Sequence, residues 1–165
     1  MAEADQLDAL NRLHHLFDDA SIEYWLFGGW AVDLHVGAVT RPHEDLDVAI
    51  WRADYARASE LLAADGWVHA PDPGEDGSTG FVRGSVRLDL AFLARDERGE
   101  IYTPLRDGRA GWAAGAFEHD TGEVGGVRAR VISLKSLKAE KSEAHEDAIA
   151  AAKDRADIAT LADLG

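Results

Sequence analysis

The sequence of 165 residues has no cysteine, one methionine, four prolines and no long hydrophobic run. Without cysteine, disulfides, zinc–thiolate sites, iron–sulfur clusters and cysteine nucleophiles are excluded. Apolar runs such as Tyr24–Phe27 and Leu90–Leu93 are far shorter than the ~20 residues that cross a bilayer. The N-terminal segment is acidic and lacks the positive charge that begins a secretory signal. We therefore expect a soluble, cytoplasmic protein with no membrane partner.

Basic residues are also few. Lysine and arginine number 17 against 31 aspartates and glutamates, so the formal net charge is −14. Such a surface repels the phosphates of nucleic acids, which disfavours DNA or RNA as a partner. Divalent metals and cationic small molecules are better matches, although a high net charge also serves solubility alone.

Hydrophobic periodicity and turn residues divide the chain into helices and strands. Helices are predicted over residues 4–19, 30–36, 53–65, 134–144 and 146–164, and strands over residues 23–27, 45–51, 67–70, 79–83 and 86–93. Residues 101–115 are expected to be mostly loop. Residues 116–119 are expected to pair with residues 127–132, and Ser133 is expected to cap the helix that follows it.

This order of elements predicts one domain of the α/β (α+β) class, with a mixed β-sheet flanked by helices. A chain of 165 residues is long enough to bury a core without disulfides or structural zinc. We expect the sheet to lie within residues 1–132. Residues 133–165 are predicted to form a short C-terminal helical element that packs on the same domain.

Three aspartates form the most informative candidate site. Asp45 and Asp47 stand two residues apart in a predicted strand, so they project to one face, roughly 6 to 7 Å apart at the backbone. Asp89 lies within a strongly apolar strand, where an unpaired charge is costly. Its partner is either a basic neighbour such as Arg87 or a cation shared with the other aspartates. Three such carboxylates suit Mg²⁺, whereas a D-x-D pair alone also fits two solvated surface acids.

Gly28 and Gly29 join a predicted strand to the helix that follows it. Small residues there allow a phosphate to approach the backbone, and the N–H groups of a helix N-terminus carry partial positive charge. A plain turn is the simpler explanation of the pair taken alone. The chain lacks the Lys-Ser/Thr of a P-loop and the third glycine of a dinucleotide-binding fingerprint, so those two folds are disfavoured.

The order of strand, Gly-Gly, helix, D-x-D strand and distant aspartate resembles the nucleotidyltransferase superfamily, which has the fold of DNA polymerase β. The stretch Trp25–Asp33, followed by Thr40-Arg41, His43 and Asp45-Leu46-Asp47, is similar to the aminoglycoside 2''-adenylyltransferase and lincosamide nucleotidyltransferase group. The resemblance implies a nucleotidyltransferase catalytic domain over residues 1–132. It covers most of the chain and is most specific within this stretch.

The C-terminal segments Leu137–Lys141 and Lys153–Ile158 resemble helical elements common in the same group. The aminoglycoside enzymes continue into a larger helical region that clasps the antibiotic, and little chain follows Asp157 here. The acceptor pocket is therefore either completed by a second chain or built for a different acceptor, and we expect a monomer or a homodimer.

The resemblance also implies a reaction. Asp45 and Asp47 would hold two Mg²⁺ ions that bridge the phosphates of an NTP, with ATP as the expected donor. Asp89 would complete one metal site and act as general base toward the acceptor hydroxyl, which attacks the α-phosphorus and releases pyrophosphate. Lys141 and two nearby lysines can equally be solvated helix charges. The residues implied to bind the nucleotide are Gly28, Gly29, Arg41 and Lys141.

The acceptor implied by the resemblance is a small cationic molecule, such as an aminoglycoside or a lincosamide antibiotic, and this agrees with the acidic composition. A toxin-like nucleotidyltransferase that modifies tRNA or a protein is one alternative, but the sequence shows no basic stripe to meet tRNA phosphates. A non-catalytic nucleotide-binding module is another, and the presence of all three aspartates argues against it.

Several neighbouring residues have simpler structural explanations. Arg41 can form an ion pair with Asp33 or another nearby acid instead of contacting phosphate. His43 either lines the site or lies exposed in a turn. Trp30 and Trp112 either pack in the core or stack on a base or sugar ring.

Overall fold

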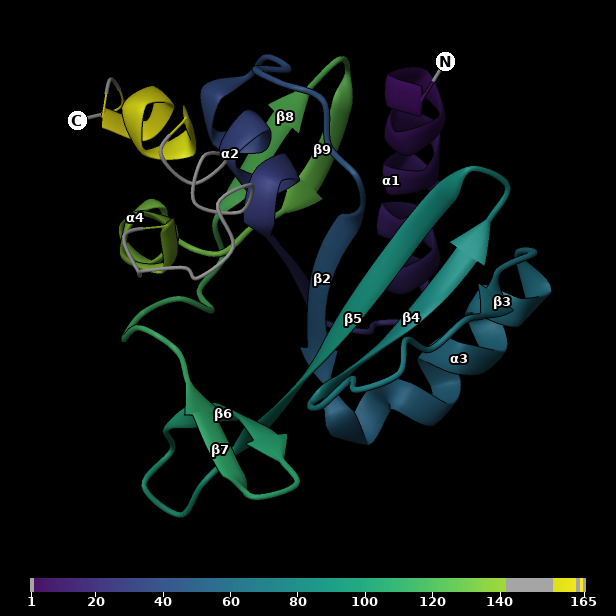
Figure 1. Cartoon of the computed structure of the whole chain (residues 1–165), viewed down its shortest axis with the longest axis vertical. Helices are drawn as coiled ribbons and strands as arrows, with labels where there is room; N and C mark the ends of the chain where they lie inside the picture. The colour runs from purple at the N-terminus through teal and green to yellow at the C-terminus, as the bar shows by residue number, and fades with distance from the viewer. Residues whose placement is uncertain (1, 142–155, 163, 165) are drawn as a thin grey trace.

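A mixed β-sheet forms the centre of the computed structural model, which describes residues 2–141, 156–162 and 164 (Figure 1). Its five main strands are β1 Tyr24–Phe27, β2 Leu46–Trp51, β3 Val68–His69, β4 Ser78–Arg83 and β5 Val86–Arg95. They lie in the order β1-β2-β5-β4-β3, with β2 and β5 parallel and every other neighbouring pair antiparallel. The predicted α+β class and its mixed sheet are thereby confirmed.

Helices pack around the sheet where the hydrophobic periodicity predicts them. They are α1 Ala2–Asp19, α2 Gly28–Val36, α3 Tyr55–Ala64, which follows the 3₁₀ turn η1 Arg52–Asp54, and α4 Leu134–Lys141. In α1, Leu10, Leu13 and Phe17 fall on one helical face and are buried, which fixes the side that the helix turns to the core. In the view of Figure 1, α1 lies behind the sheet.

The alternation of side chains along β5 separates the core from the candidate site. Leu88 and Leu90 are fully buried, and Phe92 on the same face packs against Tyr55 of α3 with ring centroids 5.0 Å apart. Asp89 lies between these residues in sequence, so it points to the opposite face of the sheet. One face of β5 thus belongs to the core, while the other carries the predicted metal ligand.

The prediction of a loop over residues 101–115 is wrong in its first part. There, β6 (Ile101–Leu105) and β7 (Gly108–Gly111) form a hairpin, and β6 also pairs with the end of β5. All four residues of β7 are exposed and two are glycine, so this strand has no apolar alternation to recognise. In Figure 1 the hairpin projects at the lower left, away from α1.

A separate hairpin joins β8 (Thr121–Val124) to β9 (Val127–Arg130). The strand predicted over residues 127–132 is confirmed, but its predicted partner at residues 116–119 is wrong. The pair Gly125-Gly126 has φ values of 56° and 78°, which suit a two-residue hairpin turn. This tight turn brings the partner strand closer in sequence than the broader turn that was expected.

The segment after β9 follows the prediction as far as it is described. Ser133 caps α4, because its Oγ accepts a hydrogen bond from the backbone N–H of Ser136 at 3.2 Å. Residues 142–155, predicted to belong to two helices, lie outside the described residues, and residues 156–162 are helical. None of the described helices is long and apolar enough to cross a membrane.

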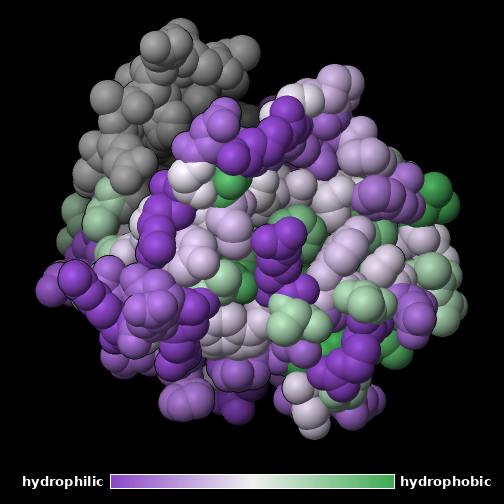
Figure 2. Space-filling view, turned by 90° about the horizontal axis from the view of Figure 1, so that it is seen from below, coloured by the Kyte–Doolittle hydropathy of each residue, from purple (hydrophilic) through white to green (hydrophobic). Residues whose placement is uncertain are grey.

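The surface is mainly polar. On the face seen in Figure 2, hydrophilic residues predominate and hydrophobic residues lie in small, separate groups. Among the large hydrophobic residues that the structure describes, those that are exposed are Val68, Ile158 and Leu164. Most large apolar side chains are therefore in the core, where the burial of each contributes roughly 1.5–3 kcal/mol.

Candidate active site

The three aspartates of the predicted metal site lie together on one face of the sheet. Asp47 in β2 and Asp89 in β5 stand opposite each other in the parallel register, and Asp45 lies just before β2. One carboxylate oxygen from each residue lies within 4.8 Å of the other two. All three residues are partly exposed, so a ligand has access to them. The pairing of β2 with β5 therefore assembles the cluster that the sequence predicts.

Electrostatic repulsion makes this cluster suitable for a cation. Burial, a hydrogen bond with Asp89 and repulsion from Asp89 and Glu44 raise the pKa of Asp45 to about 7, while Arg87 opposes this shift. Without a cation, one proton thus relieves the crowding of negative charge. Carboxylate oxygens in this arrangement are the ligands that hard ions such as Mg²⁺ or Mn²⁺ take, so the residues present fit a divalent metal.

The pKa of Asp45 leads to a prediction about metal binding. Because the metal competes with the proton on Asp45, the affinity for Mg²⁺ should rise about tenfold per pH unit below pH 7 and level off above it. Calorimetric titrations at several pH values, in buffers with different ionisation enthalpies, measure both the affinity and the proton released. Binding that is independent of pH would contradict the assignment of Asp45 as a ligand.

The same raised pKa has the opposite effect on the metal-free protein. The folded state holds the Asp45 proton more tightly than the unfolded state does, so stability is highest below the ordinary carboxyl pKa and falls as pH rises toward about 7. The matched variant Asp45→Asn lacks this titration. Its melting temperature without metal should therefore change less over the same pH range than that of the wild type.

Gly28 and Gly29 form the first turn of α2, directly beside the aspartates. Gly28 has a φ of 70°, and a Cβ there would lie 2.2 Å from Oδ2 of Asp47. A Cβ at Gly29 would lie 2.4 Å from Nδ1 of His43. Phe27, which precedes the helix, cannot cap the first N–H groups of α2 with its side chain. The backbone here has no side chain that would keep a ligand away, and the N-terminus of the helix is uncapped. Both features favour the binding of an anion such as phosphate.

A buried hydrogen-bond network holds the loop after α2. Asp33 is fully buried, and its Oδ2 lies 2.5 Å from Nε2 of His43, while its Oδ1 accepts hydrogen bonds from the hydroxyl and backbone N–H of Thr40. The ring of His43 also packs against Trp30, with centroids 4.8 Å apart. The explanation of His43 as an exposed turn residue is therefore wrong. Trp30 is a core residue, as its simpler explanation predicts.

Arg41 is bound to the C-terminal helix. Its Nε and Nη2 lie 2.8 and 2.9 Å from the two carboxylate oxygens of Asp157, whose side chain is 1% exposed. An ion pair of Arg41 with a nearby acid, such as Asp33, Glu44 or Asp45, was the alternative to a phosphate contact, and the acid that the structure places against Arg41 is the distant Asp157, while Asp33 binds His43 and Thr40. No pattern in the sequence connects Arg41 with Asp157, since the two residues lie far apart in the chain.

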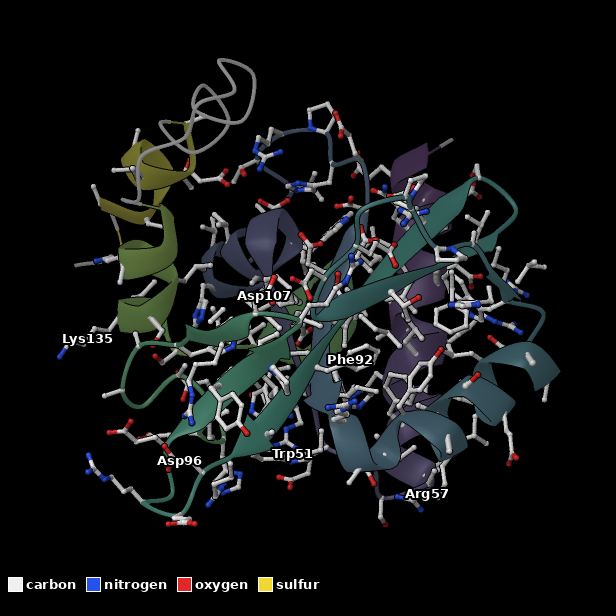
Figure 3. The ribbon with its side chains drawn as sticks, turned by 60° about the horizontal axis from the view of Figure 1, so that its bottom comes forward. Trp51, Arg57, Phe92, Asp96, Asp107 and Lys135 are labelled. Carbon is white, nitrogen blue, oxygen red and sulfur yellow. The ribbon has the colours of Figure 1, made fainter. Side chains whose placement is uncertain are left out.

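The lysine predicted to contact phosphate is not placed. Lys141 is the last residue of α4, and its side chain lies outside the described part of the structure, as do residues 153–155 of the second family-like segment. Lys135, near the start of α4, points outward in Figure 3. It matches the solvated helix charge that was the simpler explanation.

A pocket of about 520 Å³ opens over the aspartates. Asp47 and Asp89 line it, together with residues of the β6–β7 hairpin, α4 and the segment before β4. Trp112 is part of its wall, because the indole N–H donates to Oγ1 of Thr103 at 2.9 Å and the ring packs against Phe27. The pocket thus places the candidate metal ligands at the edge of a space large enough for a small molecule.

The comparisons with known proteins agree with these features. The family model of aminoglycoside-2''-adenylyltransferases matches residues 9–161. A curated 2''-aminoglycoside nucleotidyltransferase from Klebsiella pneumoniae is 33% identical over 120 residues, which is 70% of this chain and 55% of that protein. The chain therefore matches little more than half of the length of this relative.

Two solved structures share the fold over nearly the whole chain. The lincosamide antibiotic adenylyltransferase LnuA, solved with lincomycin bound, has a TM-score of 0.76 at 19% identity, covering 96% of this chain and 97% of that one. ANT(2'')-Ia, solved in complex with adenylyl-2''-tobramycin, has a TM-score of 0.77 at 18% identity, covering 98% of this chain and 90% of that one. The family match extends over most of the sequence, and the chain belongs to the aminoglycoside-2''-adenylyltransferase family.

Proposed function

We propose that this protein transfers a nucleoside monophosphate, AMP from ATP in the first instance, to a hydroxyl group of a small antibiotic-like acceptor. The observation that carries this proposal is the cluster of Asp45, Asp47 and Asp89 beside the N-terminus of α2, of which Asp47 and Asp89 line the pocket. Family membership supports the same reaction class. The two solved relatives hold lincomycin and adenylyl-2''-tobramycin, a lincosamide and an aminoglycoside product.

Each residue has a proposed role. Asp45 and Asp47 would hold the divalent metal, with two Mg²⁺ ions as the expected complement, and the metal would supply positive charge to the NTP phosphates. Gly28 and Gly29 approach the phosphates through their backbone N–H groups. Arg41 and Lys141 are expected to add positive charge on the nucleotide side, where the Arg41–Asp157 pair fixes the position of the guanidinium.

Asp89 is proposed as the general base and a further metal ligand. The acceptor hydroxyl gives its proton to the Asp89 carboxylate as its oxygen forms a bond to the α-phosphorus. The bond between the α-phosphorus and the bridging oxygen to the β-phosphate breaks at the same time, and pyrophosphate leaves with that oxygen. The products are a nucleotidyl ester of the acceptor and pyrophosphate.

The acceptor is proposed to be a small cationic molecule. The net charge of −14 and the exposed Asp76 at the pocket wall favour an amine-bearing acceptor over a nucleic acid. The pocket that Asp89 lines is also lined by Trp112, whose aromatic ring can pack against the apolar face of a sugar. Aminoglycosides and lincosamides both combine amines with sugar hydroxyls, so both belong in the test.

An acceptor screen tests the proposal. The purified protein is incubated with Mg²⁺, each of the four NTPs, and either tobramycin or lincomycin, and pyrophosphate release is followed with a coupled assay. We expect release that needs both the metal and one acceptor, with a mass increase of the acceptor equal to one nucleoside monophosphate. Release that occurs only with tRNA or a protein acceptor would favour the toxin-like alternative. The absence of release with every acceptor would contradict the proposed reaction.

A further inference from the structure

Arg87 links the candidate base to a neighbouring loop. On β5, two residues before Asp89 and on the same face, its Nε and Nη2 lie 3.1 and 3.0 Å from Oδ1 of Asp89. Nη2 also donates to Asp72 at 2.9 Å and to Glu75 at 3.3 Å, and Nη1 donates to the carbonyl oxygen of Ala70 at 3.1 Å. The planar guanidinium is suited to holding several oxygen acceptors in fixed directions.

The sheet makes room for this guanidinium at Gly80. Gly80 in β4 pairs directly with Asp89, and a Cβ at Gly80 would lie 2.1 Å from Nη2 of Arg87. The backbone of Gly80 also accepts a hydrogen bond from the N–H of Ala70 at 2.8 Å. Any side chain at this position would displace Arg87 from both Asp89 and the loop.

The loop that Arg87 holds is closed on itself and forms part of the pocket. The N–H of Asp72 donates to Oε1 of Glu75 at 2.8 Å, and the N–H of Glu75 donates to the carbonyl of Asp72 at 3.2 Å. At the end of the loop, Gly77 accepts a hydrogen bond from the N–H of Phe92 at 2.9 Å. Asp76 and Gly77 line the pocket, so the position of the loop sets the position of this wall.

The order of the strands places this wall on the acceptor side. Phe27, Asp47, Asp89 and Gly80 form one row across β1, β2, β5 and β4. The phosphate-binding N-terminus of α2 follows Phe27 at one end of the row, and Arg87 with its loop lies at the other. An in-line displacement puts the attacking hydroxyl opposite the leaving pyrophosphate. The acceptor therefore approaches from the Asp89 and Arg87 end.

We propose that Arg87 is a positioning residue that couples acceptor binding to the orientation of the base. It holds Oδ1 of Asp89 and so fixes the orientation of the carboxylate that is proposed to take the proton of the acceptor hydroxyl. With the same guanidinium it fixes the wall formed by residues 70–78. This inference rests on the proposed nucleotidyl transfer, because it gives Arg87 its effect through Asp89. Arg87 affects both the orientation of Asp89 and the position of the wall without contacting the substrates.

Kinetic constants of substituted proteins separate the two halves of this role. Arg87→Gln should lower kcat about tenfold or more and raise the acceptor KM severalfold, because it removes charge-assisted hydrogen bonds to both Asp89 and the loop. The KM for ATP should change by less than about twofold, since the nucleotide side of the row is untouched. Arg87→Lys keeps the positive charge but not the planar guanidinium that binds several acceptors at once, so it should restore only part of kcat.

The double variant Asp72→Asn/Glu75→Gln removes the charge-assisted contacts of Arg87 with Asp72 and Glu75 and so weakens its hold on the loop, while its bonds to Asp89 and to the carbonyl of Ala70 remain. It should raise the acceptor KM severalfold with kcat kept within about twofold, a split that general loss of structure does not produce. Arg83→Gln is the matched control. Arg83 lies on β4 and donates to the backbone carbonyl of Asp65 at 2.8 Å, a residue that is not one of the three aspartates of the site. Unchanged kinetics in Arg87→Gln, or equal rises in the KM of both substrates, would overturn the proposal.

Hydrogen exchange tests the coupling without depending on the reaction. In Arg87→Gln the amides of Ala70 and Phe92, which bond to Gly80 and Gly77, should exchange at least about tenfold faster, while Arg83→Gln leaves them unchanged. Protection equal to that of the wild type would contradict the role of Arg87 in holding the loop. A wild-type protein inactive with every acceptor would instead count against the proposed function, so the two failures are distinguishable.

Discussion

Asp47→Asn should reduce acceptor-dependent pyrophosphate release by about a thousandfold or more, because the charge that a divalent metal supplies is worth several kcal/mol in the transition state. Asp47 stands opposite Asp89 in the row across the sheet and beside the glycine that begins α2. It is thus the carboxylate between the proposed phosphate side and Asp89, the proposed base. Steady-state kinetics at saturating Mg²⁺ and ATP, with the acceptor varied, measure the effect.

Loss of folding does not account for this effect if stability is measured in parallel. Removing one of three crowded carboxylates relieves repulsion, so the melting temperature of Asp47→Asn without metal should stay within about 4 °C of the wild type or rise. Asp19→Asn, which changes an exposed acid at the end of α1, is the matched control and should keep full activity. Retention of more than a tenth of the activity by Asp47→Asn would remove Asp47 from the metal site.

Gly28→Ala should cost at least about a hundredfold in activity, since a displacement of about 1 Å at reacting groups has an effect of this size. A Cβ at this position would lie 2.2 Å from Oδ2 of Asp47, so the carboxylate must move away from its place beside Asp45 and Asp89, the other proposed metal ligands. The positive φ adds strain of about 1–2 kcal/mol to any residue with a Cβ. We therefore expect both kcat and the affinity for Mg²⁺ to fall.

A second glycine separates strain from displacement. Gly84 has a φ of 61°, similar to that of Gly28, but a Cβ there would meet no atom within 4 Å. In Gly84→Ala the same strain should lower the free energy of unfolding, measured by chemical denaturation, by about 1–2 kcal/mol. The activity of this variant should be unchanged. If both alanine variants lost activity equally, general strain rather than the displacement of Asp47 would be the cause.

The fold and the cluster of three aspartates are predictable because local sequence patterns determine them. Asp45 and Asp47 share a strand face by their spacing, and the apolar pattern of β5 gives Asp89 the face opposite the core. The order of elements indicates a mixed sheet, and the parallel pairing of β2 with β5 brings the aspartates together. What the sequence could not supply is the register that sets Asp47 against Asp89.

The contacts that sequence reasoning missed are long-range or lack a hydrophobic pattern. Arg41 and Asp157 form an ion pair although most of the chain lies between them in sequence. The residues of β7 are all exposed and do not alternate between apolar and polar, so periodicity could not predict this strand. The buried pair of Asp33 and His43 depends on how the loop after α2 folds back, which spacing alone does not determine. The domain boundary at residue 132 and the choice between monomer and homodimer stay predictions.

The glycines of the site also constrain how this protein can diversify. At positions 28, 29 and 80, the space of a Cβ is taken by Asp47, His43 and Arg87, so these positions tolerate almost no substitution. The four residues of β7 are instead exposed, and Ala110 and Gly111 border the same pocket. If the proposed reaction holds, substitutions that change the acceptor should accumulate in the β6–β7 hairpin, while Asp47, Asp89 and the three glycines stay unchanged. A library of variants confined to this hairpin should therefore change which acceptors are bound while the proposed metal ligands and base are kept.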